Sequence, residues 1–195
     1  MHTQSLNIQI SGQHIDIGAS LQEHVSDRIH NVVNKYLTTA QGCHVYFAKK
    51  DREFACNIII NDGAGRHRAI KSNCSSNEIY NSFDSAITKL EKQLRRYKSK
   101  LTDNHNGHIK PSEISTSAVK YVISSDHDGE NEINMENPAI VAEKPVDILS
   151  LSIGEAVMMM DLENLPALMF ENVKTKRINV VYYRKDGNIS WVDTK

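Results

Sequence analysis

The sequence predicts an α+β protein built from two modules. Short segments with the alternating apolar and polar residues of half-buried strands occur in both halves of the chain. Two longer segments in the first half have the 3.6-residue apolar period of amphipathic helices. A polar stretch without either period separates the halves. Of the 195 residues, 39% are hydrophobic and 24% are charged, values that are ordinary for globular proteins.

The first module is expected over residues 1–104, with the element order β-α-β-β-β-α. Residues 6–10 alternate as a strand does, and Gly12 ends them. Ser20 and Glu23 have the spacing of a capping box at the start of the first helix. That helix carries a continuous apolar stripe: Leu21, Val25, Ile29, Val32 and Tyr36. The strands CHVYFAKK and EFACNIII follow it, joined by Asp51-Arg52.

A hairpin and a second helix complete the first module. Asn61-Asp62-Gly63 is a hairpin signal, because type I′ turns need positive φ at both central positions. Residues 66–73 are the expected returning strand. The second helix starts near Ser76 and has its own apolar stripe: Ile79, Phe83, Ile87, Leu90, Leu94, Tyr97 and Leu101. Both helices are able to pack on one face of a mostly antiparallel sheet.

Residues 105–138 are expected to form a flexible, acidic linker. They hold two Lys against six Asp and Glu and are rich in Ser and Asn. Their short apolar piece, Val119–Ile123, is too isolated to form a domain core.

The second module is expected over residues 139–195. It begins with a strand that has Pro145 at an edge or bulge. Ser152 and Glu155 then form a second candidate capping box, which leads into a short helix. Three strands follow, the last two joined by a turn at Asp186-Gly187.

The basic stretch KLEKQLRRYKSK lies in the second helix of a chain whose formal net charge is −1. At 100° per residue its cations point away from the apolar stripe. They are either a solvated face near the helix C-terminus or a face that binds phosphates. The candidate RNA-binding residues of this helix are Lys89, Lys92, Arg95, Arg96, Lys98 and Lys100. The cations that would widen this surface are Arg28, Lys35, Arg66, Arg68 and Lys71.

No RNP1-type aromatic motif or GXXG loop accompanies these cations, so recognition of backbone and shape is expected. Catalytic motifs are missing as well. The three cysteines have no CxxC spacing, the nine histidines have no metal-ligand spacing, and GxSxG, GxGxxG and P-loop motifs do not occur. We therefore expect no enzyme activity, cofactor, metal or small-molecule substrate. No apolar run reaches a membrane span and no signal peptide begins the chain, which favours a cytoplasmic protein without a membrane partner.

The second module has many apolar residues for its size. They are either a self-sufficient core or, in part, a two-fold interface with a second copy, since a module this small is marginally stable alone. The candidate homodimer interface is Leu168, Met169, Phe170, Ile178, Val180 and Tyr182.

Three segments of the chain carry a family resemblance. The first is IQISGQHIDIGASLQEHV, near the start, and the second is EIYNSFDSAITKLEKQLRRYKSKL, in the second helix. The third is SIGEAVMMMDL followed by INVVYYRKDGNISWVD, near the end. With these segments the chain resembles the long-form ribosome hibernation promoting factors, which belong to the ribosome-associated inhibitors, also known as sigma-54 modulation proteins.

The resemblance implies that the first module is a double-stranded-RNA-binding-like sandwich of a sheet and two helices. It would bind ribosomal RNA of the small subunit near the decoding site and block the messenger and transfer RNA sites. The second module would dimerise and join ribosomes into inactive pairs, as a response to stress such as stationary phase. Two alternatives stay open: a transcription-modulating regulator, as the older family name suggests, or a generic RNA-binding protein.

Overall fold

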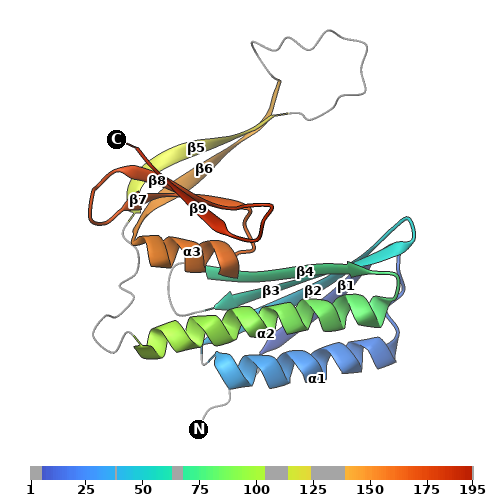
Figure 1. Cartoon of the computed structure of the whole chain (residues 1–195). Helices are drawn as coiled ribbons and strands as arrows, with labels where there is room; N and C mark the ends of the chain where they lie inside the picture. Colours follow the sequence, from blue (N-terminus) through green and yellow to red (C-terminus); the bar gives the residue numbers. More distant parts are fainter. Residues whose placement is uncertain (1–5, 38, 63–67, 104–113, 124–138, 195) are drawn as a thin grey trace.

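The chain forms two units, a sheet covered by two helices and a sheet covered by one helix, as seen in a computed structural model (Figure 1). The structure describes residues 6–37, 39–62, 68–103, 114–123 and 139–194. The elements of the first unit are β1 (Asn7–Gln13), α1 (Ala19–Tyr36), β2 (Ala40–Lys50), β3 (Glu53–Asp62), β4 (Arg68–Ser76) and α2 (Ile79–Asp103). Its order is the predicted β-α-β-β-β-α.

The sheet of the first unit has the strand order β1-β2-β3-β4. β1 and β2 are parallel because α1 carries the chain back across the sheet between them. β2, β3 and β4 follow as antiparallel neighbours. The tight turn predicted at Asp51-Arg52 is confirmed, and Asp51 adopts a φ of 55° there. The turn expected at Gly63 lies outside the described residues.

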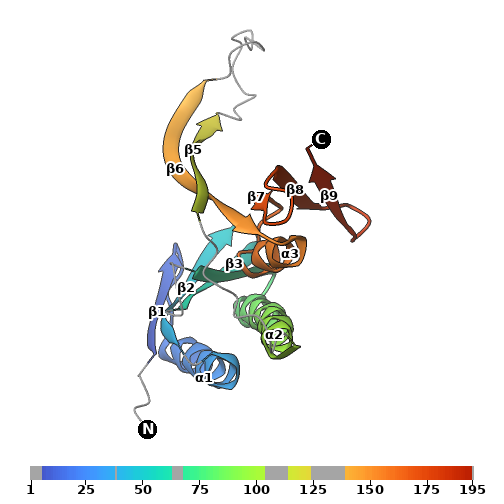
Figure 2. The same ribbon diagram turned by 90° about the vertical axis from the view of Figure 1, so that its left-hand side faces the viewer.

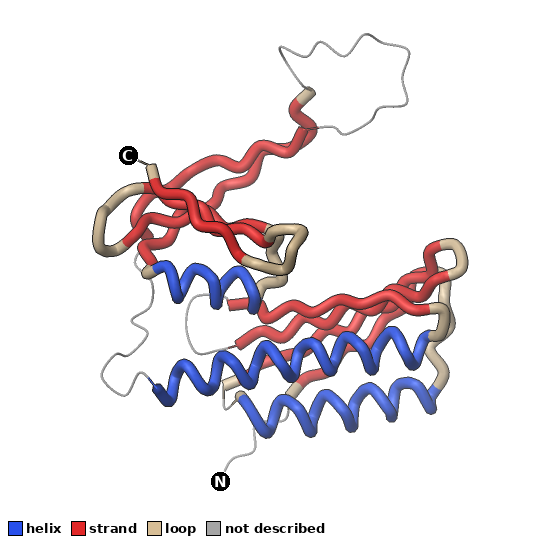
Figure 3. Tube along the Cα trace, in the orientation of Figure 1, coloured by secondary structure: helices blue, strands red, loops and turns tan. Residues whose placement is uncertain are grey.

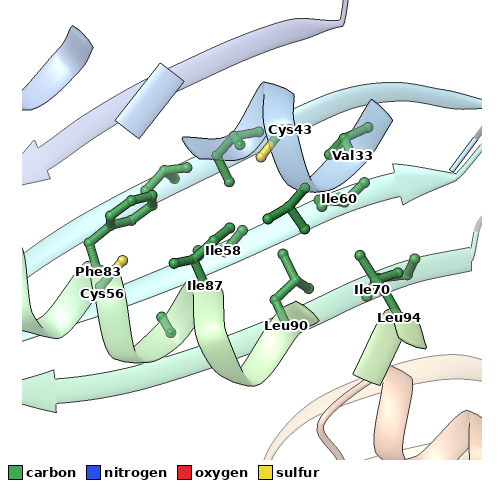
Figure 4. Close-up of a cluster of buried hydrophobic side chains, with 14 of the residues drawn as sticks. Val33, Cys43, Cys56, Ile58, Ile60, Ile70, Phe83, Ile87, Leu90 and Leu94 are labelled. Carbon is green, nitrogen blue, oxygen red and sulfur yellow. The ribbon is translucent and has the colours of Figure 1, made fainter. Parts of the chain in front are cut away.

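The core of the first unit lies between the sheet and its two helices, which run side by side on one face (Figures 1 and 2). Phe83, Leu90 and Leu94 of α2 are fully buried against the strands. Ile58 and Ile60 of β3 point toward them (Figure 4). The apolar stripes predicted for both helices are therefore the faces that the sheet buries.

The first of the two predicted capping boxes is wrong. α1 begins at Ala19, its N-cap is Gly18, and no side chain caps it. Ser20 therefore lies inside the first turn, where it cannot accept from the N-terminal amides; the Gly18 carbonyl accepts from Leu21 and Gln22 instead, each at 3.1 Å.

The second unit has a five-stranded sheet in the order β5-β6-β7-β8-β9. Its elements are β5 (Ile114–Ile123), β6 (Ile140–Leu151), α3 (Ile153–Leu162), β7 (Ala167–Asn172), β8 (Ile178–Tyr183) and β9 (Ile189–Asp193). α3 packs on one face of the sheet, and its core includes Met160, Phe170 and Val181. The turn at Gly187 is confirmed, with a φ of 84°.

The linker prediction is wrong for Ile114–Ile123, which form β5 and pair with β6. β6 pairs with β7 only at Ser150 and Leu151, so most of its backbone groups need another partner, and β5 supplies it. Val119, Tyr121 and Ile123 are exposed, so the strand has no buried face whose apolar period would reveal it in the sequence. Pro145, predicted at an edge or bulge, lies in β6 opposite Val119 of β5.

Ser152→Ala should destabilise the second unit by about 1 kcal/mol, because Ser152 forms a complete capping box. Its hydroxyl accepts from the Glu155 amide at 3.3 Å, and the Glu155 carboxylate accepts from the Ser152 amide at 2.8 Å. Ser20→Ala is the matched control, and we expect it to change stability by less than about 0.5 kcal/mol. Urea unfolding followed by circular dichroism measures both. Equal losses for the two variants would contradict the two helix starts seen in the structure.

Candidate nucleic-acid interface

The cations of α2 lie on the helix face that points away from the sheet. Lys92, Arg95, Arg96 and Lys98 are exposed, and Lys89 is half-buried. Side chains of Lys100, Arg66 and Arg68 lie outside the described part of the structure. The described cations form three groups around α2: one toward α1, one toward α3, and one on the crest between them.

The group toward α1 is held by Glu91. Its carboxylate accepts from Lys35 Nζ at 2.9 Å and from the Tyr36 hydroxyl at 3.0 Å. These hydrogen bonds lower the pKa of Glu91 and raise that of Lys35. Lys98 Nζ donates to the backbone oxygen of Lys35 at 2.9 Å. Arg28 is exposed on α1, and its charge also acts on Glu91. The structure thus places Arg28 and Lys35 next to the α2 cations.

The group toward α3 contacts the second unit. Lys89 Nζ donates to Asn164 Oδ1 at 2.7 Å. Arg96 Nη1 lies 3.3 Å from Asp161 Oδ2. These two cations therefore already have oxygen partners within the chain.

The crest consists of Lys92 and Arg95. Within the described residues neither forms a hydrogen bond or ion pair, so both are available to an external anion. A shallow depression of about 540 Å³ extends from the crest along α2 and is lined by Asn81, Asp84, Ser85, Thr88, Lys89 and Lys92. We call Lys92 and Arg95, together with Arg28, Lys35 and Lys98, the cationic face.

The structure does not bring Lys71 to this face. Ile70 and Ser72 of β4 point toward α2, where the Ser72 hydroxyl donates to the backbone oxygen of Ala86 at 2.8 Å. Because successive side chains of a strand alternate, Lys71 leaves β4 on the opposite side. The sequence also indicated no role for Asp161 and Asn164, since nothing local indicates that the end of α3 and the loop after it meet α2.

His24, Cys43 and Cys56 of the first unit take part in its packing. His24 Nε2 lies 3.0 Å from Asp84 Oδ1 and packs edge-on against Tyr80 and Phe83. Burial raises the pKa of the Cys43 and Cys56 thiols to about 12. The described residues contain no group of three or more His, Cys, Asp or Glu side chains arranged to hold a metal ion.

The residues predicted for a dimer interface fall on two sides of the second sheet. Phe170 is fully buried and Leu168 half-buried, both on the side that α3 covers. Met169, Ile178, Val180 and Tyr182 alternate with them and share the opposite side with Val192, which pairs with Val180. We call these five the outer face; Met169 is 47% and Val192 51% exposed.

The fold and the cationic face define a class: a two-unit α+β protein that presents one basic helix to solvent. Residues 8–102 match the family described as Sigma 54 modulation protein / S30EA ribosomal protein, and residues 135–190 match its C-terminal part. The chain belongs to this family. Among the described helices, none has the length and apolar character needed to cross a membrane.

Two relatives are similar over nearly the whole chain, and both are named "Ribosome hibernation promotion factor". The one from Bradyrhizobium diazoefficiens is 32% identical over 193 residues, covering 96% of this chain and 94% of that protein. The one from Rhizobium meliloti is 33% identical over 191 residues, covering 96% and 97%. A solved ribosomal subunit interface protein from Coxiella burnetii is 22% identical with a TM-score of 0.42, covering 48% of this chain and 99% of that one.

Thiol labelling tests the packing beneath the cationic face. In the native protein, Ellman's reagent should modify Cys74 first, because Cys43 and Cys56 are fully buried and Cys74 is not. With a pKa of about 12, the two buried thiols would be ionised in only about one molecule in a thousand at pH 9. They should therefore react only after denaturation. Three thiols reacting at one rate in the folded protein would contradict this arrangement.

Proposed function

We propose that this protein is a ribosome hibernation factor, which binds ribosomal RNA of the small subunit and stops translation under stress. The cationic face is the observation that carries the proposal, because Lys92 and Arg95 have no hydrogen bond or ion pair to a described residue and lie beside three further cations. Two relatives of nearly the same length that are named for ribosome hibernation support it. The site of action would then be the cytoplasm, where ribosomes work.

The proposed mechanism is steric occlusion driven by electrostatic attachment. Lys and Arg that contact phosphates release counterions, which provides affinity without reading sequence. α1 and α2 together form a helix layer whose inner face is buried against the sheet (Figure 2). Bound near the decoding site, this layer would exclude messenger and transfer RNA by its volume alone.

The second unit would join two copies through the outer face. Its five residues are apolar or aromatic, and they lie together on a side of the sheet that α3 does not cover. A small unit commonly gains stability by covering such a face with a second copy. Phe170 and Leu168 would support this interface from the core rather than line it. A dimer of this kind would pair two ribosomes.

The family description also names sigma 54 modulation, so a role in transcription is the second candidate. In that case the cationic face would meet a polymerase component or another nucleic acid. Sedimentation of the full chain with purified ribosomes and, separately, with RNA polymerase distinguishes the two functions.

Lys92→Glu with Arg95→Glu should weaken binding to purified small ribosomal subunits by about tenfold or more, because two attractive phosphate interactions become repulsive. The dependence of affinity on salt should also become shallower, by roughly one unit of logarithmic slope for each phosphate that the protein no longer neutralises. Co-sedimentation at several salt concentrations measures both effects.

The matched control is Lys50→Glu with Arg52→Glu. It makes the same change of charge at exposed positions next to the β2–β3 turn, at the far end of the sheet from these cations (Figure 1). We expect this control to bind nearly as well as the unmodified chain. An equal loss in both variants would mean that only net charge matters, and unchanged binding of the α2 variant would remove the cationic face from the proposal.

Met169→Glu should convert a dimer into a monomer while the second unit stays folded. Met169 is 47% exposed, so a charge there is tolerated in one copy, whereas burying an unpaired charge in an interface costs several kcal/mol. Sedimentation velocity at micromolar concentration measures the change. Thr175→Glu, in the exposed turn between β7 and β8, is the control. A Met169→Glu protein that is still dimeric would place the interface elsewhere.

A further inference from the structure

The second unit packs directly on the helix that carries the cationic face. α3 lies along α2 and the end of β4 (Figures 1 and 3). Met158 and Leu162 of α3 are 8% and 2% exposed, and both belong to the apolar cluster of the first unit. The contact is therefore a packed interface between the two units.

Polar side chains next to this apolar contact bind the α3-side cations of α2. Asp161 lies against Arg96 and also accepts from the Tyr183 hydroxyl at 3.2 Å. Asn164 accepts from Lys89 and donates through Nδ2 to Asn73 Oδ1 at 3.0 Å. A carboxylate and an amide oxygen thus occupy positions beside Arg96 and Lys89 that a phosphate oxygen would take.

The interface also contains one unmet polar atom. Gln93 of α2 is 3% exposed, and its Nε2 donates to the backbone oxygen of Asp161 at 2.7 Å. Its Oε1 is buried and has no hydrogen-bond partner in the described part of the chain. Leaving a buried amide oxygen unpaired is unfavourable, and water would satisfy it if α3 moved away. The contact between the two units is therefore less stable than a contact of the same size in which every polar atom has a partner.

We propose that the C-terminal unit and RNA compete for α2, so that the chain has a closed form and an RNA-binding open form. This inference rests on the proposed RNA-binding role of the cationic face. In the closed form, Lys89 and Arg96 are engaged by Asn164 and Asp161, and α3 lies beside the crest that RNA would approach. If nine in ten molecules are closed, the apparent affinity for RNA falls about tenfold.

Opening the contact should tighten RNA binding without any change to a cation. Asn164→Gly removes both hydrogen bonds of that side chain and keeps the backbone unstrained, since Asn164 has a φ of 52°. Met158→Asp places a charge in the apolar part of the contact. We expect affinity to rise about threefold for the first variant and up to tenfold for the second. The probes are purified small ribosomal subunits and a fluorescent RNA duplex of about 20 base pairs.

Thr175→Gly is the matched control, because it makes a similar change in an exposed turn of the same unit. We expect this variant to bind both probes with the affinity of the unmodified chain. Hydrogen exchange of the α2 segment reports opening independently of RNA. Faster exchange with unchanged or weaker RNA binding would overturn the competition, because the contact would then be part of the binding form.

Locking the contact should have the opposite effect. Lys89 and Asn164 meet across the interface, so Cys substitutions at both, in a Cys74→Ser background, are placed for a short reducible thiol crosslinker. The locked protein should bind each probe at least about tenfold more weakly than the same sample after reduction. Failure to crosslink, or equal binding before and after reduction, would overturn the closed form.

The two probes separate this inference from the proposed function. If the reduced protein binds the duplex but not ribosomal subunits, and the locked protein binds neither, the competition stands and the ribosomal role fails. If the reduced protein binds neither probe, the cationic face does not bind RNA and both proposals fail.

Discussion

The burial of one face of α2 against the sheet determines where everything else in the first unit lies. Phe83, Leu90 and Leu94 occupy the core, so the helix cannot rotate without exposing them to water. The cations that alternate with these residues are consequently fixed on the outer side, at positions set by 3.6 residues per turn. The same packing aligns α1 with α2 and brings Lys35 to Glu91. The burial of apolar side chains thus fixes both the shape of the outer surface and the positions of its charges.

The three groups of cations on α2 differ in their surroundings although they are close together in sequence. Those toward α1 share the Glu91 carboxylate, which links the C-terminal end of α1 to the middle of α2. Those toward α3 are bonded to the second unit. Only the crest has no internal partner among the described residues. The second half of α2 is rich in Lys and Arg, but fewer of these cations are available to an external anion than their number in the sequence suggests.

The sequence allowed most of the first unit to be predicted, because each element there obeys one period and meets its neighbours through short connections. Prediction failed where a local polar pattern pointed to the wrong residue, and where the determinant was not local. The start of α1 is set by the backbone of Gly18, whereas the capping-box pattern at Ser20 and Glu23 predicted a start at the wrong residue. β5 forms because β6 needs a hydrogen-bonding partner, a requirement invisible in the residues 114–123 themselves. The contact of Asn164 with Lys89 joins positions 75 apart in sequence, and no periodicity encodes such a pair.

Pro145 limits how another strand can add to β6. β6 extends well beyond its short pairing with β7, so one side of the strand is, among the described residues, an open edge onto which a foreign strand could add. A proline there removes a backbone donor, and the exposed Glu143, Lys144 and Asp147 add charge nearby. Runaway strand-by-strand polymerisation is thereby discouraged. What remains for contacts with other molecules is the side-chain surface of the sheet.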